Sequence, residues 1–236
     1  MGGQYIEPMP PSWTTSQCEV CRRGSAARLC DACRAEHAGP ALRCGRCALR
    51  LPSPEAVCAG CTREAPALRR TVCAVDYGFP WDRLVAGFKF QGQPELAGLM
   101  VELLHRAAPA DAADDLDLLV PVPLSAPRLA ERGYDQAWEL ARRLARRLQR
   151  PARCGLLERR VGTERQTELG RDARRANLRG AFQVPASRMR DVRGRRVALV
   201  DDVMTTGATA GEAARTLLQA GAASVELWVF ARTPAC

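Results

Sequence analysis

The chain has 236 residues, 47% of them hydrophobic and 26% charged, which is typical of a globular protein with one ordinary domain and one small one. No run of eighteen apolar residues occurs, which excludes a membrane span, and residues 1–17 lack the basic residue and apolar core of a secretory signal. The net charge of +9 comes almost wholly from arginine. Such a charge favours polyanionic partners, either nucleic acid or phosphorylated small molecules. Heavy use of arginine and alanine is equally well explained by the base composition of the genome.

We expect residues 1–17 to be a disordered lead and the chain to be cytoplasmic. Four C-x-x-C pairs follow, and two pairs complete one tetrahedral Cys₄ zinc site. A redox function would use one such pair, whereas four in series, around almost no apolar core, favour two structural zinc ions in a double ribbon over residues 18–67. Sequential pairing is favoured over a cross-braced one, and removal of zinc is expected to spare the rest of the chain. The predicted ligands are Cys18, Cys21, Cys30 and Cys33 for one ion, and Cys44, Cys47, Cys58 and Cys61 for the other.

A second domain is predicted over residues 68–236, beginning with a strand at 71–77. Apolar residues at helical spacing then indicate a helix over 81–90, and Pro94 starts another that runs through residue 105. Lys89, the only lysine, could reach a phosphate from the end of the first helix. A lysine that extends along an amphipathic helix into solvent is the commoner arrangement.

Residues 116–122 read as a buried strand, which Pro121 and Pro123 end abruptly. A loop that carries Arg128 follows, and then a long helix runs through residue 150. Its leucines share one face and its arginines lie off that face, a pattern that indicates a solvated surface more often than contact with nucleic acid. The polar stretch 160–171 predicts a mobile loop that closes over a ligand.

The apolar residues 197–200 predict a strand buried on both faces, and Asp201 and Asp202 follow at its carboxyl end, where parallel sheets place their ligand sites. Small and hydroxyl-bearing residues at 205–209 then lead into a helix, an arrangement that binds phosphate through backbone N–H groups and the helix dipole. Carboxylates beside such a loop suit a ribose diol or a cation, so the pattern predicts a sugar-phosphate site. A Walker B strand is excluded because no Gly-Lys-Ser/Thr loop occurs, and a receiver-type acidic pocket disagrees with the absence of a later lysine. The remaining alternative to a sugar-phosphate site is a core strand that runs into an ordinary turn.

This segment resembles the phosphoribosyl pyrophosphate (PRPP) signature of type I phosphoribosyltransferases. The cysteine pairs, Val-Pro-Val-Pro-Leu at 120–124, Arg-Gly-Tyr-Asp-Gln at 132–136 and Gly-Ala-Phe at 180–182 are together similar to the ComF family of bacterial competence proteins, from about residue 18 to the end. The resemblance implies an α/β fold, with a mostly parallel sheet flanked by helices and preceded by a zinc ribbon. It also implies binding of PRPP with Mg²⁺, transfer of the phosphoribosyl group with release of pyrophosphate, and a link to uptake of single-stranded DNA. The alternative is a non-catalytic PRPP or nucleotide sensor, or an adaptor that handles single-stranded DNA and partners a helicase.

The resemblance also implies roles for individual residues. The two aspartates would hold the ribose hydroxyls, one of which would share Mg²⁺ with the leaving pyrophosphate, and the loop with Arg128 would receive that pyrophosphate. The family pattern has His where this chain has Ser125 and Asn where it has Asp135, and an acid at 135 would weaken any pyrophosphate contact there. The expected catalytic residues are Asp201, Asp202 and Arg128, and the expected PRPP-binding residues are Val203, Met204, Thr205, Thr206, Gly207, Ala208, Thr209 and Lys89.

Overall fold

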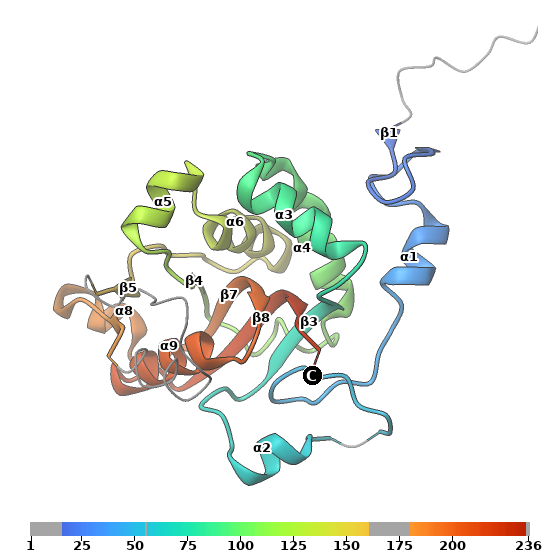
Figure 1. Ribbon diagram of the computed structural model, residues 1–236. Helices are drawn as coiled ribbons and strands as arrows, with labels where there is room; N and C mark the ends of the chain where they lie inside the picture. The colour runs from blue at the N-terminus through green and yellow to red at the C-terminus, as the bar shows by residue number, and fades with distance from the viewer. Residues whose placement is uncertain (1–15, 55, 161–179, 235–236) are drawn as a thin grey trace, which may run out of the picture. The chain divides into compact units, whose positions relative to one another are not determined.

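A computed structural model describes residues 16–54, 56–160 and 180–234 (Figure 1). The described chain forms two compact units that divide between Gly39 and Pro40. The predicted lead at 1–17 lies outside the described residues except for its last two positions. The predicted closing loop at 160–171 likewise lies outside them except for its first.

The smaller unit has very little apolar core. A short antiparallel pair, β1 (Ser16–Gln17) with β2 (Gly24–Ser25), precedes one helix, α1 (Asp31–His37). Among its described residues, 16–39, Leu29 is the only buried residue besides two cysteines. Cys30 caps α1, where its Sγ accepts from the backbone N–H of Cys33 at 3.5 Å. So little buried apolar surface agrees with a unit whose folding depends on a metal.

The larger unit is built on a four-stranded sheet in which every neighbouring pair is parallel, in the order β3–β8–β7–β4. Apolar residues fill both faces of β7, as expected of a strand covered on two sides. The α/β fold class with a parallel sheet is therefore confirmed. The strands are β3 (Thr71–Asp76), β4 (Leu118–Pro121), β7 (Arg196–Met204) and β8 (Ser224–Arg232).

Helices cover both faces of this sheet (Figure 1). On one face, α4 contacts β3 and β8, and α6 contacts β4 and β7, while α9 packs against β7 and β8 on the other. Trp81 at the start of α3 meets Phe230 of β8 edge to face, with ring centroids 5.8 Å apart. The helices are α3 (Trp81–Phe90), α4 (Ala97–Ala107) after the 3₁₀ turn η1 (Pro94–Leu96), α5 (Ala126–Arg132), α6 (Gln136–Leu148), η2 (Ala186–Arg188), α8 (Met189–Val192) and α9 (Ala208–Gln219).

Two predicted elements have different ends in the structure. The strand predicted at 197–200 continues through both aspartates to Met204, because β8 keeps pairing with it as far as Arg232. The loop predicted to carry Arg128 ends at Ser125, because α5 begins at Ala126; Gly133, whose left-handed φ of +75° ends α5, precedes the predicted long helix, which is α6. In the described portion of the chain, no helix combines the length and the hydrophobicity needed to cross a membrane.

The second cysteine cluster belongs to the same unit as the sheet. The edge strand β3 is joined to it by two hydrogen bonds from Thr71, one from the backbone N–H to the Gly45 carbonyl at 2.9 Å and one from Oγ1 to the Arg46 carbonyl at 2.7 Å. Arg43 pairs with Asp76 at 2.6 Å, further along β3. The helix α2 (Ala59–Arg63) begins directly after Cys58 and contains Cys61, the second member of the last cysteine pair. The division expected at 18–67 and 68–236 stays a prediction.

Candidate functional site

Two groups of four cysteines each bring their Sγ atoms within 4.8 Å of one another. The groups are Cys18, Cys21, Cys30 and Cys33, and Cys44, Cys47, Cys58 and Cys61, which is the sequential grouping. Four thiolates complete the tetrahedral coordination that zinc prefers, so each group could hold one structural zinc ion and would leave no open position for catalysis. Burial opposes ionisation of Cys18 and Cys44, but backbone N–H groups outweigh it and lower the pKa of these thiols to about 6 and about 7.

We expect protein purified without added zinc to contain two equivalents of the metal by elemental analysis. Replacing Cys18 and Cys21 by serine should leave one equivalent, because that variant retains the second group intact. The matched control is Cys154→Ser, an exposed cysteine outside both groups, which should retain two. Less than one equivalent in the wild-type protein would contradict two structural zinc sites.

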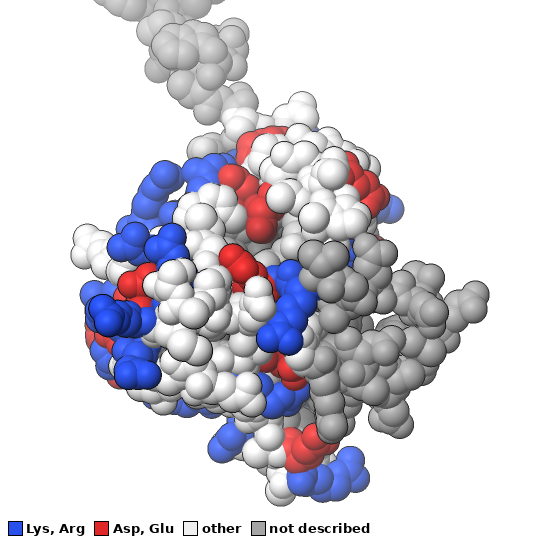
Figure 2. All heavy atoms as spheres, turned by 90° about the vertical axis from the view of Figure 1, so that its left-hand side faces the viewer, with Lys and Arg blue, Asp and Glu red and all other residues white. Residues whose placement is uncertain are grey.

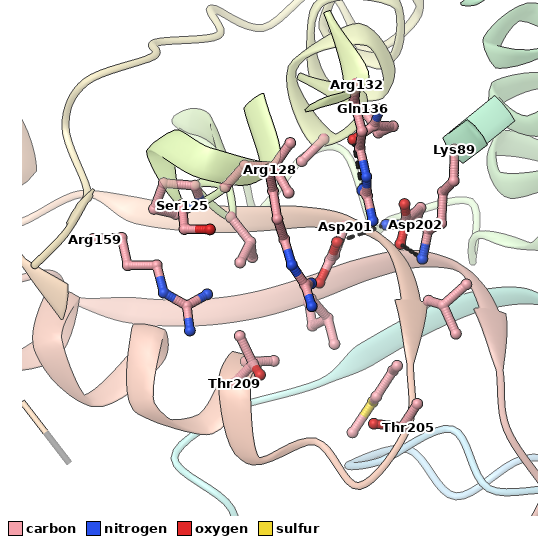
Figure 3. Close-up of a pocket in the computed structure, with 18 of the residues that line it drawn as sticks. Lys89, Ser125, Arg128, Arg132, Gln136, Arg159, Asp201, Asp202, Thr205 and Thr209 are labelled. Atoms are coloured by element: carbon pink, nitrogen blue, oxygen red, sulfur yellow. Dashed lines mark hydrogen bonds and ion pairs between the residues drawn. The ribbon is translucent and has the colours of Figure 1, made fainter. Parts of the chain in front are cut away.

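A pocket of about 380 Å³ opens at the carboxyl end of the parallel sheet (Figure 3). This is the edge at which open α/β sheets place their ligands. Its walls come from α3, α5, α6, β5 (Glu158–Arg159), β7 and the start of α9. The polar residues that line it are Lys89, Ser125, Arg128, Arg132, Gln136, Arg159, Asp201, Asp202, Thr205 and Thr209.

Both residues of the acidic pair line this pocket. Successive side chains of a strand point to opposite faces of the sheet, so the two carboxylates leave β7 in different directions although both line the pocket. Asp202 is buried and pairs with Lys89 at 2.8 Å (Figure 3). Asp201 is half-buried, and its Oδ1 accepts from the backbone N–H of Asp202 at 2.8 Å. Burial, together with the charge of Asp202, raises the pKa of Asp201 to about 7, although Lys89 opposes this shift.

Lys89 is therefore not the solvent-extended lysine that its helix would suggest. Its side chain is 18% exposed and is held against the acidic pair at the end of α3. The ion pair offsets the charge of one of two adjacent carboxylates. Without it, a partly buried site could not keep both carboxylates ionised.

The segment 205–209 joins β7 to α9 beside the acidic pair. Gly207 has a φ of +82° and caps α9, and a Cβ at this position would clash with Cε of Met204. Glycine is required here by the left-handed backbone. Thr205, Gly207 and Thr209 line the pocket with Val203 and Met204, whereas Thr206 and Ala208 are not among its lining residues. Met204 is 6% exposed, and its Cε lies close to Gly207 of this loop. The first N–H groups of the twelve-residue helix α9 supply donors and a positive dipole end.

The opposite wall carries arginines and a buried glutamine. Nη1 of Arg132 donates to Oε1 of Gln136 at 2.8 Å, and its guanidinium lies 5.2 Å from the ring centroid of Phe90. Since arginine can only donate, this bond fixes the amide, with Nε2 of Gln136 as the remaining donor. Gln136 is 1% exposed, and neither its Nε2 nor Nε of Arg132 has a hydrogen-bond partner among the described residues. Buried N–H groups without acceptors are costly, so these two indicate an oxygen-rich ligand.

The two positions that depart from the ComF pattern have different surroundings. Ser125 lines the pocket at the start of α5. Asp135 is not among the lining residues, and it caps α6 by accepting from the backbone N–H of Trp138 at 3.0 Å. Burial raises the pKa of Asp135. An aspartate is a good N-cap, which gives the acid at this position a structural reason.

The structure brings Arg128 and the acidic pair together in one pocket, with three further polar lining residues that were not predicted from the sequence. Arg132 and Gln136 are four positions apart, a spacing that signals contact only within one helix, and Gly133 interrupts the helix between them. Arg159 lies on the two-residue strand β5, which pairs with β6 (Phe182–Gln183) and has no recognisable pattern in the sequence.

Residues 135–236 match the model of the phosphoribosyl transferase domain family, which defines the class of the larger unit. The DNA utilization protein YhgH of Escherichia coli (strain K12) is 32% identical over 224 residues, which cover 92% of this chain and 96% of that protein. Competence protein F of Haemophilus influenzae is 34% identical over 80% of this chain and 84% of its own, and competence protein ComFC of Bacillus subtilis is 30% identical over 87% and 85%. The chain therefore belongs to the ComF family, as its motifs indicated.

Among solved structures, a glutamine PRPP amidotransferase from B. subtilis complexed with ADP and GMP aligns with 58% of this chain and 26% of its own. The sequence identity is 20% and the TM-score is 0.37.

Proposed function

We propose that this protein binds PRPP together with Mg²⁺ and transfers its phosphoribosyl group to an acceptor with release of pyrophosphate. The observation that supports this most is the convergence of three kinds of group on one pocket: an acidic pair, a helix N-terminal loop, and buried donors without acceptors. These match the three parts of PRPP, namely its ribose hydroxyls, its 5′-phosphate and its diphosphate.

In the proposed reaction, the bond from C1 of the ribose to the diphosphate oxygen breaks, its electron pair leaves with the diphosphate, and the acceptor's nucleophile bonds to C1. Asp201 and Asp202 would accept hydrogen bonds from the ribose hydroxyls, and the 205–209 loop would hold the 5′-phosphate. Arg128, Arg132 and Gln136 would stabilise the charge that develops on the diphosphate. Such catalysis rests on positioning and charge compensation.

Magnesium fits the chemistry of this pocket. Carboxylate and phosphate oxygens are its preferred ligands, and Asp201 has no ion-pair partner within the described ranges. When bound, Mg²⁺ would neutralise diphosphate charge next to a ribose hydroxyl that Asp201 orients. The acceptor is expected to be a nucleophile that needs no activation, such as a nitrogen.

A role in handling DNA is the second candidate, and the names of the relatives favour it. We propose single-stranded DNA and a competence-type helicase as partners, in which case the pocket would be a PRPP sensor. The arginine face of α6 gives this limited support, because Arg142 and Arg143 both pair with Glu139. On the face that Figure 2 shows, basic side chains lie in separate groups between acidic and uncharged ones. A cytoplasmic location stays a prediction.

The test is calorimetric titration with PRPP–Mg²⁺, combined with an assay for pyrophosphate release in the presence of nucleobases and amines. The informative variant is Gln136→Glu, which keeps an acceptor for Arg132 and replaces the unpartnered donor by an oxygen. We expect it to weaken PRPP binding 10- to 100-fold, the value of one charge-assisted hydrogen bond, or about 1.5–3 kcal/mol. Ribose 5-phosphate, which lacks the diphosphate, should bind wild type and variant equally.

Absence of PRPP binding to the wild-type protein would contradict the proposal as a whole. Equal weakening of ribose 5-phosphate would contradict the diphosphate role of Gln136. Binding of PRPP without pyrophosphate release for any acceptor would favour the sensor over the enzyme.

A further inference from the structure

Arg232, the last residue of β8, joins the second cysteine cluster to the pocket loop. Its Nε donates to the carbonyl of Cys47 at 3.0 Å. Its Nη1 donates to the carbonyl of Met204 at 3.4 Å and also to that of Thr205. One guanidinium thus contacts both a residue of the cysteine group and the first residue of the 205–209 loop.

The environment of Arg232 makes this contact costly to disturb. The residue is 9% exposed and has no ion pair with any acidic residue in the described part of the chain, so carbonyl oxygens alone compensate its charge. A buried charge that loses its hydrogen-bond partners is strongly destabilising. Movement of either segment away from Arg232 would leave donors unsatisfied, and the positions of the two segments are therefore linked.

The cysteine segment has little besides a metal to fix it internally. The buried residues of its small cluster are Cys44, Leu51 and Cys58. Cys47 also packs against the main core, which the buried Ala48 enters, and a tetrahedral ion would add the constraint of the other three thiolates to this packing. The position of the Cys47 carbonyl is thus expected to depend on metal occupancy.

We propose that Arg232 is a positioning residue through which metal binding at the second cysteine cluster and ligand binding at the 205–209 loop stabilise each other. The proposal rests on the proposed function, in which that loop holds the 5′-phosphate of PRPP. It revises the sequence-based expectation that zinc removal spares the rest of the chain. Coupling of this kind is reciprocal, so bound PRPP must strengthen zinc retention at the second cluster by the factor by which zinc strengthens PRPP binding.

The experiment measures equilibrium competition for zinc between the full-length protein and a zinc-selective chromogenic chelator, with and without saturating PRPP–Mg²⁺. The Cys18→Ser/Cys21→Ser variant isolates the second site. We expect PRPP to raise its apparent zinc affinity at least fivefold, within the range typical of coupled sites. The first site, isolated in a Cys44→Ser/Cys47→Ser variant or assigned by difference from wild type, should show no such increase.

Two arginine variants separate positioning from general support. Arg232→Gln should abolish the effect of PRPP on zinc affinity, and Arg232→Lys serves if the first variant does not fold. The matched control is Arg43→Gln, because Arg43 donates to the carbonyl of Ala48 at 3.1 Å and pairs with Asp76 but has no hydrogen bond to the loop. This control should weaken zinc binding and retain the effect of PRPP.

PRPP affinity is measured by calorimetry under the same conditions, which keeps the two proposals apart. If PRPP binds and zinc affinity at the second site does not change, the coupling is wrong and the proposed function stands. The coupling is also wrong if Arg232→Gln retains the PRPP effect, or if Arg43→Gln loses it equally. If PRPP does not bind, both proposals fail.

Discussion

Replacing Asp201 and Asp202 together by asparagine is expected to weaken PRPP binding by a factor on the order of a hundred or more. The substitution removes two carboxylates that would accept charge-assisted hydrogen bonds from the ribose diol, each worth about 1.5–3 kcal/mol. The measurement is calorimetric titration with PRPP–Mg²⁺ at pH 8, where Asp201, with its pKa raised to about 7, is mostly ionised. The fold should persist, because asparagine is isosteric with aspartate.

The ion pair with Lys89 requires a control of its own. Asparagine at 202 also removes the partner of Lys89, so part of any loss could come from a displaced lysine. Lys89→Met breaks the same ion pair and retains both carboxylates, and it should weaken PRPP binding less than the double variant does. Asp135→Asn is the matched control for removal of a half-buried acid, since Asp135 caps α6 and is not among the lining residues. It should leave PRPP affinity unchanged.

Inorganic phosphate supplies the last comparison. The loop at 205–209 is expected to hold phosphate without help from either carboxylate, so the double variant should bind phosphate as well as the wild-type protein does. Equal PRPP affinity in the double variant and the wild type would rule out the diol role and leave the pair as a feature of the end of β7.

The parts of the molecule that were predictable from sequence are those with local physical causes. A strand buried on both faces must be apolar, which made 197–200 recognisable. A helix that begins just after such a strand places Asp201 beside residues 205–209, and this does not depend on the rest of the fold. The cysteine pairs were recognisable because zinc coordination fixes both residue type and spacing. The α/β class and the metal groups therefore agree with expectation.

The unpredicted features depend on contacts between distant segments. Arg232 and Cys47 are 185 positions apart, and Arg132 meets Gln136 across a helix break. The sequence predicts a boundary near residue 68, between the cysteine region and the second domain. Hydrogen bonds from Thr71 to the second cluster, which no periodicity encodes, join that cluster to β3. The contacts of Glu226 with Arg69 and Arg70 are a further such feature, because nothing in the apolar sequence of β8 around Glu226 indicates them.

Glu226 is the basis of the second large effect, which concerns stability. Its side chain is 1% exposed on β8, and it accepts from Nε of Arg69 at 2.9 Å and from Nε and Nη2 of Arg70, both at 3.1 Å. The register places Glu226 opposite Ala198, three residues before Asp201, so this network lies toward the opposite end of the strands from the pocket. Replacing both arginines by glutamine would leave a carboxylate without its charged partners in the interior of the sheet.

The Arg69→Gln/Arg70→Gln variant is expected to lose about 3–5 kcal/mol of unfolding free energy, as when one side of a buried ion pair is removed. Denaturant unfolding with zinc present, followed by the fluorescence of the fully buried Trp228 and the other tryptophans, measures this loss. Adding Glu226→Gln to that variant removes the orphaned charge, so the triple variant should be more stable than the double one. The matched control is Glu102→Gln, which breaks a pair whose side chains are 32% and 56% exposed and should change stability by less than about 0.5 kcal/mol. A triple variant less stable than the double one would show that Glu226 contributes through its shape and neutral contacts, and not through its charge.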